Sequence, residues 1–215
     1  MITLLTCLIV ISAILHIHAE YRGPRYRVYV FKPLTTILII MIAWKAAHAN
    51  AGVYAYAIFA GLVFSLAGDI FLMLPSDRFL AGLVSFLVAH LFYLAAFVSG
   101  TGFGFSMGFL IPLLLYGIFM CALLMPYAGD MKIPVIFYMA VILVMAWQAW
   151  ERWGLTGQGA ALMAALGAVL FIVSDSLLAV NRFRIQFKSA LALILGTYFA
   201  AQWLIALSVS QTPTP

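Results

Sequence analysis

The sequence predicts an all-α membrane protein: a polytopic bundle of eight transmembrane helices in one domain. Of its 215 residues, 67% are hydrophobic and only 8% are charged, and the mean hydropathy is +1.16. A water-soluble domain needs a polar surface and does not reach this apolar content. The apolar residues also come in continuous runs of about 20, the length at which a helix crosses ~30 Å of hydrocarbon. Strands of a membrane barrel would instead give shorter, alternating segments.

Eight apolar runs have the length of a membrane crossing, and Pro, Gly and charged residues separate them, as at Gly23-Pro24. The first run begins at Met1 with no preceding Lys or Arg, so we expect a retained span and not a signal peptide. Cys7 and Cys121 give no disulfide or metal pattern. The predicted spans are 2–19, 32–49, 52–74, 79–98, 107–126, 132–150, 157–180 and 187–209, and residues 209–215 form a short tail of the single domain 1–215.

The basic residues favour one side of the predicted bundle. Of the 11 Lys and Arg residues, all but Lys45 and Arg152 lie at the first, third, fifth and seventh connections. Because positively charged connections stay in the cytoplasm, both termini are expected on the non-cytoplasmic face of a cell membrane. The net charge of +5 reflects this bias and suits anionic lipid headgroups, and no nucleic-acid partner is expected. The basic residues on the favoured side are Arg22, Arg25, Arg27, Lys32, Arg78, Lys132, Arg182, Arg184 and Lys188.

Two similar segments predict a 4+4 parallel internal repeat. Asp69 and Asp175 each follow a Gly by eight residues and a Gly or Ser by one, and each precedes a short connection that ends in Arg-Phe. Four spans in each half would make both halves run in the same direction through the membrane. The alternative is a chance match, since shared apolar composition raises internal similarity. The small residues of the two segments are Gly61, Gly68, Gly167 and Ser174.

Asp69 and Asp175 are the candidate catalytic residues. A carboxylate near the bilayer centre costs roughly 2.5 to 3.5 kcal/mol and usually has a function. Both residues lie near the cytoplasmic end of their spans, and the small residues beside them would let the two helices approach each other. Two neighbouring carboxyl groups titrate as a unit, so that one can act as a general acid and the other as a general base. The alternative is that each Asp simply pairs with a basic residue or a backbone donor.

Five further residues are candidates for substrate binding. His90 and Tyr93 lie one turn apart in the fourth predicted span, and Tyr198 and Gln202 lie one turn apart in the last. They are expected to form a polar layer that lines a cavity, although hydrogen bonding between helices is an equal alternative. Lys32 begins the second predicted span, where its ammonium group could hold a phosphate. The histidine spacing matches no zinc motif, so no metal or other cofactor is expected.

Six segments form a recognisable set: KPLT (32–35), GLVFSLAGDIFLML (61–74), FLAGLVSFLVAHLFY (79–93), PVIFYMAVILVMAW (134–147), GAVLFIVSDSLLAVNRF (167–183) and GTYFAAQWLI (196–205). Together they resemble the YhhN-like lysoplasmalogenase family. The resemblance implies an integral membrane hydrolase that converts a lysoplasmalogen, a lysophospholipid with a vinyl-ether chain, into a fatty aldehyde and glycerophospho-ethanolamine or glycerophosphocholine. It also implies that Asp69 and Asp175 are the acidic residues of the family motif.

A coupled carboxyl pair suits this reaction, because vinyl-ether hydrolysis needs a proton donor and an anion beside the developing cation. Three other functions remain open. The Asp pair could serve as the proton relay of a lipid or small-molecule transporter. The protein could be a zinc-dependent hydrolase, or a lipid-binding or scaffold protein without catalysis. The expected partners are the lysophospholipid and the surrounding membrane lipids, and no oligomeric state is indicated.

Overall fold

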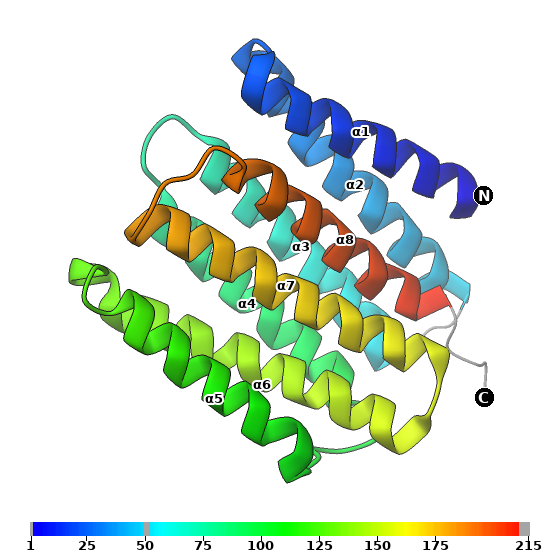
Figure 1. The fold of residues 1–215 in the computed structure, drawn as a ribbon. Coiled ribbons are helices and arrows are strands. Elements are labelled where there is room, and N and C mark those ends of the chain that lie inside the picture. Colours follow the sequence, from blue (N-terminus) through cyan, green and yellow to red (C-terminus); the bar gives the residue numbers. More distant parts are fainter. Residues whose placement is uncertain (1, 50–51, 211–215) are drawn as a thin grey trace.

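The computed structural model describes residues 2–49 and 52–210 (Figure 1). These residues form eight α-helices and one 3-10 turn, without a strand, and each α-helix is long and apolar enough to cross a membrane. The predicted all-α membrane bundle with eight spans is therefore confirmed. Residues 211–215 of the predicted tail lie outside the described residues. The elements are α1 (Ile2–Arg22), α2 (Arg25–Ala49), α3 (Val53–Met73), α4 (Phe79–Val98), α5 (Met107–Leu124), η1 (Gly129–Met131), α6 (Lys132–Thr156), α7 (Gly159–Phe183) and α8 (Ala190–Ser210).

Several helices extend beyond the predicted apolar runs. Helix α1 continues to Arg22 and α2 already begins at Arg25, so only Gly23 and Pro24 connect them. An apolar run marks the hydrocarbon core, whereas a helix can continue into the headgroup region, where Arg, Lys and Tyr are well tolerated. As a consequence Lys32 does not begin its helix as predicted. It lies about two turns inside α2 and is buried.

The helices pack mainly with their neighbours in the sequence. The most extensive helix pairs are α3 with α4 and α7 with α8, while α4 packs against α6 and α2 against α8 to join the two halves. Helices α1 and α5, the first of each predicted half, lie at opposite edges of the bundle (Figure 1). The internal repeat itself stays a prediction.

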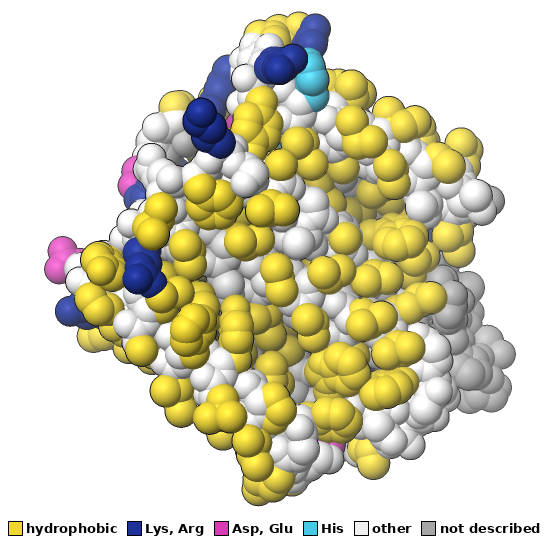
Figure 2. Space-filling model, in the orientation of Figure 1, with side chains coloured by type: hydrophobic (Ala, Val, Ile, Leu, Met, Phe, Trp, Pro, Cys, Tyr) yellow, Lys and Arg dark blue, Asp and Glu magenta, His cyan; other side chains and the backbone are white. Residues whose placement is uncertain are grey.

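The surface separates into an apolar belt and a basic end. Apolar side chains cover most of the face seen in Figure 2, and Lys and Arg gather at one end. This basic end carries the connections α1–α2, α3–α4, α5–α6 and α7–α8, whereas α1 starts and α8 finishes at the other end (Figure 1). Such a surface is expected of a bundle whose sides face lipid chains.

The small residues of α3 and α7 allow close packing, but against other partners than predicted. A Cβ atom on Gly61 would lie 2.3 Å from Cε1 of Tyr93 on α4, and one on Gly167 would lie 2.9 Å from the carbonyl oxygen of Ala201 on α8. Helices α3 and α7 do not pack directly on each other in the described part of the chain. The expectation that these residues bring the two Asp-bearing helices together is therefore wrong. They instead admit an aromatic ring and a neighbouring backbone.

Two buried polar residues, Gln148 and Glu151, lie at the end of the bundle opposite the basic end, and their contacts stabilise the fold. Glu151 accepts hydrogen bonds from the backbone N–H and the hydroxyl of Ser106, at 2.6 and 2.9 Å. The side-chain amide of Gln148 exchanges two hydrogen bonds with the backbone of Gly104, at 2.9 and 3.1 Å. These contacts attach the α4–α5 connection to α6, and they satisfy the polar groups that they bury.

Candidate active site

A polar cavity of about 520 Å³ opens at the basic end of the bundle. Both candidate catalytic residues, Asp69 on α3 and Asp175 on α7, line this cavity, as do Lys32 on α2 and Tyr198 on α8. The two carboxyl groups therefore share one cavity although their helices do not pack together. Five further charged residues line it nearer the surface, namely Glu20, Arg25, Asp77, Arg78 and Arg182.

Asp69 lies in the wall of the cavity and is only 1% exposed. The ammonium nitrogen of Lys32 lies 3.5 Å from its Oδ1. The hydroxyl groups of Thr36 and Tyr198 donate hydrogen bonds to its Oδ2, at 2.7 and 2.8 Å. All three partners are donors that stabilise an ionised carboxylate. The ion pair that the sequence left open as a structural alternative is thus present at Asp69.

A hydrogen-bonded network leads from Asp69 into the bundle. The Tyr198 hydroxyl, which donates to Asp69, accepts a hydrogen bond from Nε2 of Gln202 at 3.2 Å. Oε1 of Gln202 accepts from the Tyr93 hydroxyl at 2.7 Å, and that hydroxyl lies 3.3 Å from Oγ of Ser65. The network connects α3, α4 and α8, and it fixes the orientation of the Tyr198 hydroxyl at the cavity wall. Tyr93, Tyr198 and Gln202 thus form the hydrogen bonding between helices that was the equal alternative, and of the three only Tyr198 lines the cavity.

His90 lies beside this layer without a hydrogen bond to it. The residue is fully buried, and neither ring nitrogen has a hydrogen-bond partner in the described part of the chain. Its ring centroid lies 4.6 Å from that of Phe171 and 5.2 Å from that of Tyr138, both in edge-to-face contact. Within residues 2–49 and 52–210, no group of three His, Cys, Asp or Glu side chains is arranged to hold a metal ion.

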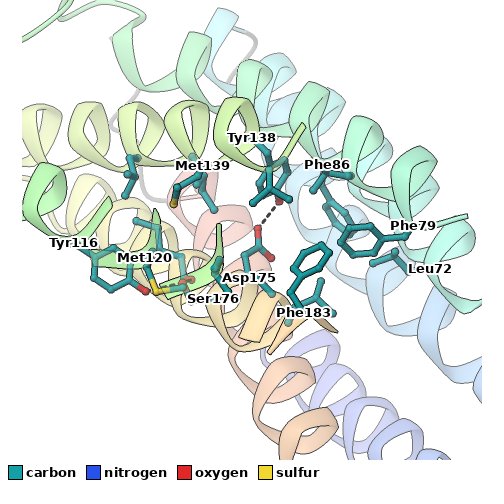
Figure 3. A pocket seen from close by; sticks show the side chains of 18 residues that line it. Leu72, Phe79, Phe86, Tyr116, Met120, Tyr138, Met139, Asp175, Ser176 and Phe183 are labelled. Carbon is teal, nitrogen blue, oxygen red and sulfur yellow. Dashed lines mark hydrogen bonds between the residues drawn. The ribbon is translucent and has the colours of Figure 1, made fainter. Parts of the chain in front are cut away.

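Asp175 has a different setting from Asp69. The Tyr138 hydroxyl donates a hydrogen bond to its Oδ2, and no ion pair to Asp175 occurs among the described residues. Asp175 also lines a second, apolar cavity of about 70 Å³ between α4, α5, α6 and α7. In Figure 3 its carboxyl group points toward Tyr138, with Phe86 and Phe183 to one side. Asp175 therefore lies where a polar and an apolar cavity adjoin.

The chain matches the model of the YhhN family over residues 28–209. It belongs to the YhhN family. The resemblance noted in the sequence is thereby confirmed. Within the family region lie all residues of both cavity walls except Glu20 and Arg25.

Relatives outside bacteria carry a functional name. The chain is 33% identical over 199 residues to the uncharacterized membrane protein YhhN of Escherichia coli O6:H1, a match that covers 93% of this chain and 95% of the relative. It is 39% identical over 189 residues to lysoplasmalogenase TMEM86A of Bos taurus, covering 85% and 77%. It is 34% identical over 185 residues to lysoplasmalogenase TMEM86B of Sus scrofa, covering 82% and 73%. No solved structure gives a significant match to the fold. The YhhN family protein is thus a multi-pass membrane protein with relatives named as lysoplasmalogenases.

The predicted substrate-binding residues lie at different distances from the polar cavity. Lys32 and Tyr198 line it, Tyr93 and Gln202 lie behind Tyr198, and His90 lies behind Tyr138. Two hydroxyl groups that touch the candidate catalytic residues were missed, those of Thr36 and Tyr138. The spacing of Lys32 and Thr36, one helical turn apart, indicated that both lie on one face of α2, but not that this face meets Asp69. Tyr138 lies in an apolar segment that gave no such signal.

Proposed function

We propose that this YhhN family protein is an integral membrane hydrolase that cleaves the vinyl-ether bond of lysoplasmalogens. The observation that carries the proposal is the position of Asp175, which lines both the polar and the apolar cavity. A lysoplasmalogen has the same division: a charged headgroup and one apolar chain, with the vinyl ether between them. The names of the relatives, lysoplasmalogenases at 34% to 39% identity, support the same reaction.

In the proposed complex the first carbon atoms of the alkenyl chain enter the apolar cavity, the rest of the chain stays in the bilayer, and the headgroup stays among the charged residues at the basic end. The vinyl ether then lies beside Asp175. Phe79 and Phe86 line both cavities, and their rings would pack against the first carbon atoms of the chain. The chain moves from one apolar environment, the bilayer, into another, so its transfer neither gains nor costs much hydrophobic free energy.

The reaction begins with a proton transferred to the β-carbon of the vinyl ether, which leaves an oxocarbenium ion. Water adds to the carbon that bears the ether oxygen and gives up a proton, and the resulting hemiacetal collapses to an aldehyde and a free glycerol hydroxyl. One water molecule is consumed and the catalytic proton is returned. The site must therefore supply an acid, an anion near the cation, and a base for the water.

Asp175 is the proposed acid and Asp69 the proposed carboxylate. A carboxyl group next to an apolar cavity holds its proton more readily than one paired with a cation. Asp175 has a hydroxyl partner, Tyr138, whereas Asp69 has Lys32 and two donating hydroxyl groups. Asp69 would stabilise the oxocarbenium ion and accept the proton of the attacking water.

The other predicted residues have supporting roles in this proposal. Tyr198 would orient Asp69 and meet the substrate at the cavity wall, while Gln202 and Tyr93 hold the Tyr198 hydroxyl in place. His90 would keep the Tyr138 ring in position by edge-to-face packing. Such positioning matters because a proton donor acts only within hydrogen-bond reach of its target.

We further propose that the basic end faces the cytoplasm of a cell membrane, because Lys and Arg are concentrated in cytoplasmic connections. Substrate would then enter the site from the cytoplasmic leaflet. A reporter that is active only in the cytoplasm, fused after the last residue, is expected to stay inactive. An active reporter would reverse the orientation.

The reaction type is tested by two lysolipids that differ in one bond. Purified protein should release a long-chain aldehyde from a lysoplasmalogen, whereas the corresponding saturated alkyl-ether lysolipid should stay intact because it has no alkene carbon to protonate. Mass spectrometry of the products measures both. An ester lysolipid is the third substrate, and release of a fatty acid from it without aldehyde from the lysoplasmalogen would mean an acyl hydrolase. Recovery of all three lipids intact would favour the transporter.

A further inference from the structure

An ion pair spans the mouth of the polar cavity. Asp77 belongs to the connection between α3 and α4, and Arg182 lies in the last turn of α7, 105 residues further along the chain. Nη2 of Arg182 donates a hydrogen bond to Oδ2 of Asp77, and both residues line the cavity. The two side chains are exposed, Arg182 at 45% and Asp77 at 64%. The pair therefore lies where a headgroup must pass to reach Asp69 and Asp175.

Aromatic packing connects this ion pair to the apolar cavity. The guanidinium carbon of Arg182 lies 5.1 Å from the ring centroid of Phe79, and the Phe79 ring meets that of Phe183 edge-on at 5.7 Å. Phe79 and Phe183 both line the apolar cavity. The Arg182 guanidinium is thus held at the junction of the two cavities, beside the expected path of a lipid with its chain in the apolar one.

Asp77 is ionised at neutral pH. The hydrogen bond from Arg182 lowers the pKa of the Asp77 carboxyl, and the backbone N–H of Phe79, 3.3 Å from its Oδ1, lowers it further. Exposed ion pairs of this kind are nonetheless weak, because water solvates both groups well. A second anion delivered to the cavity mouth can therefore take the place of the carboxylate.

The cavity mouth around Arg182 is suited to binding a phosphodiester anion. A guanidinium group presents a planar fork of donors that matches phosphate oxygens. Two more arginines, Arg25 and Arg78, line the same cavity, and neither forms an ion pair with a carboxylate in the described part of the chain. Three arginines thus face two carboxylates, Asp77 and Glu20, in this part of the cavity, so cationic charge is in excess.

We propose that Arg182 is the phosphate-binding residue for the lysolipid headgroup and that Asp77 is its competitor within the protein, displaced when the phosphodiester binds. The proposal rests on the proposed function only in that a lysolipid occupies the two cavities. The loss of a cavity residue would ordinarily weaken ligand binding. Here the removal of the Asp77 carboxylate should instead raise the affinity for phosphate-bearing lipids.

The test is equilibrium binding to the purified full-length protein in detergent, measured by native mass spectrometry. The probes are a saturated ester lysophosphatidylcholine, which has a phosphodiester but no vinyl ether, and the monoacylglycerol of the same chain, which has no phosphate. R182Q should weaken lysophosphatidylcholine binding about tenfold, the scale of one lost charge-assisted hydrogen bond, and leave the monoacylglycerol unchanged. D77N should tighten lysophosphatidylcholine binding about two- to fivefold, which matches the strength of an exposed ion pair. D77N added to R182Q should give no gain.

Two control variants separate charge from folding. R182K keeps the cation and should retain part of the phosphate preference. R184Q removes an arginine two residues away that packs over Tyr127 and lines neither cavity, and it should bind both probes like the wild type.

Three results with the variants would overturn the proposal, and a fourth comes from competition with phosphate. D77N could bind no more tightly than the wild type, R182Q could weaken both probes equally, or the D77N gain could persist without Arg182. Excess inorganic phosphate should displace the lysolipid only weakly, and full displacement at low phosphate would overturn the assignment to a lipid headgroup. Because binding needs no turnover, phosphate-dependent binding without vinyl-ether cleavage would refute the proposed function and leave the Arg182 site standing.

Discussion

Asparagine in place of Asp175 or Asp69 is expected to lower the rate of aldehyde release about a hundredfold or more, the usual scale for loss of a proton-transfer group. Asparagine has nearly the volume of aspartate but neither donates an acidic proton nor acts as a carboxylate. D175N is the cleaner of the two variants, because its amide oxygen can still accept the hydrogen bond from Tyr138 and no ion pair is broken among the described residues. The measurement is turnover of a lysoplasmalogen by each purified variant.

The double variant D69N/D175N should be only slightly slower than the slower single variant, because residues that act as one unit lose their joint effect with the first substitution. The matched control is D130N. Asp130 lies in η1 at the same end of the bundle but lines neither cavity, so its substitution should leave turnover unchanged. Well-folded D69N and D175N proteins with near-normal rates would remove the two-aspartate mechanism.

Lys32→Gln is expected to destabilise the protein by about 3 kcal/mol, the lower end of the cost of breaking a buried ion pair. Lys32 and Asp69 are both buried and lie 3.5 Å apart, on α2 and α3. Without the lysine, the Asp69 carboxylate keeps two hydroxyl donors but loses its neutralising charge in a poorly solvated wall. Thermal unfolding of the purified protein in detergent would measure the loss.

A second substitution tests the cause of that loss. K32Q/D69N has neither charge, so much of the stability should return, since neutral side chains of similar volume avoid the desolvation of both ions. The recovered protein should still be inactive. K132Q, at the exposed first residue of α6, should stay within about 0.5 kcal/mol of the wild type. If K32Q unfolds at the wild-type temperature, Lys32 does not neutralise Asp69 in the folded protein.

The features of this protein that its sequence predicts are those fixed by the bilayer. The length of each apolar run gives a membrane crossing, and the cost of a carboxylate in hydrocarbon marks Asp69 and Asp175 as unusual residues of their spans. Tyr198 and Gln202 could be grouped because their spacing puts them on one helix face, and the structure joins them to Tyr93.

The features that the sequence does not predict depend on which helices become neighbours. The stripes of small residues indicate close packing but not a partner, and Gly61 admits Tyr93 of α4 where we expected α7. The Tyr138 hydroxyl is one of many in apolar runs, and only the packing of α6 against α7 brings it to Asp175. His90 lies one helical turn from Tyr93 and was therefore expected to line a cavity, yet it packs against the rings of Tyr138 and Phe171.

Incubation of the purified protein with a lysoplasmalogen in D2O tests whether a carboxyl group in this site protonates the vinyl-ether carbon. Exchangeable protons, including that of the Asp175 carboxyl, are then deuterons. The expected products are a fatty aldehyde with one deuterium on the carbon next to the carbonyl and the glycerophospho-alcohol, and D175N should release neither. Intact lysoplasmalogen after prolonged incubation with folded wild-type protein, or an aldehyde without deuterium at that carbon, would show that no such proton transfer takes place.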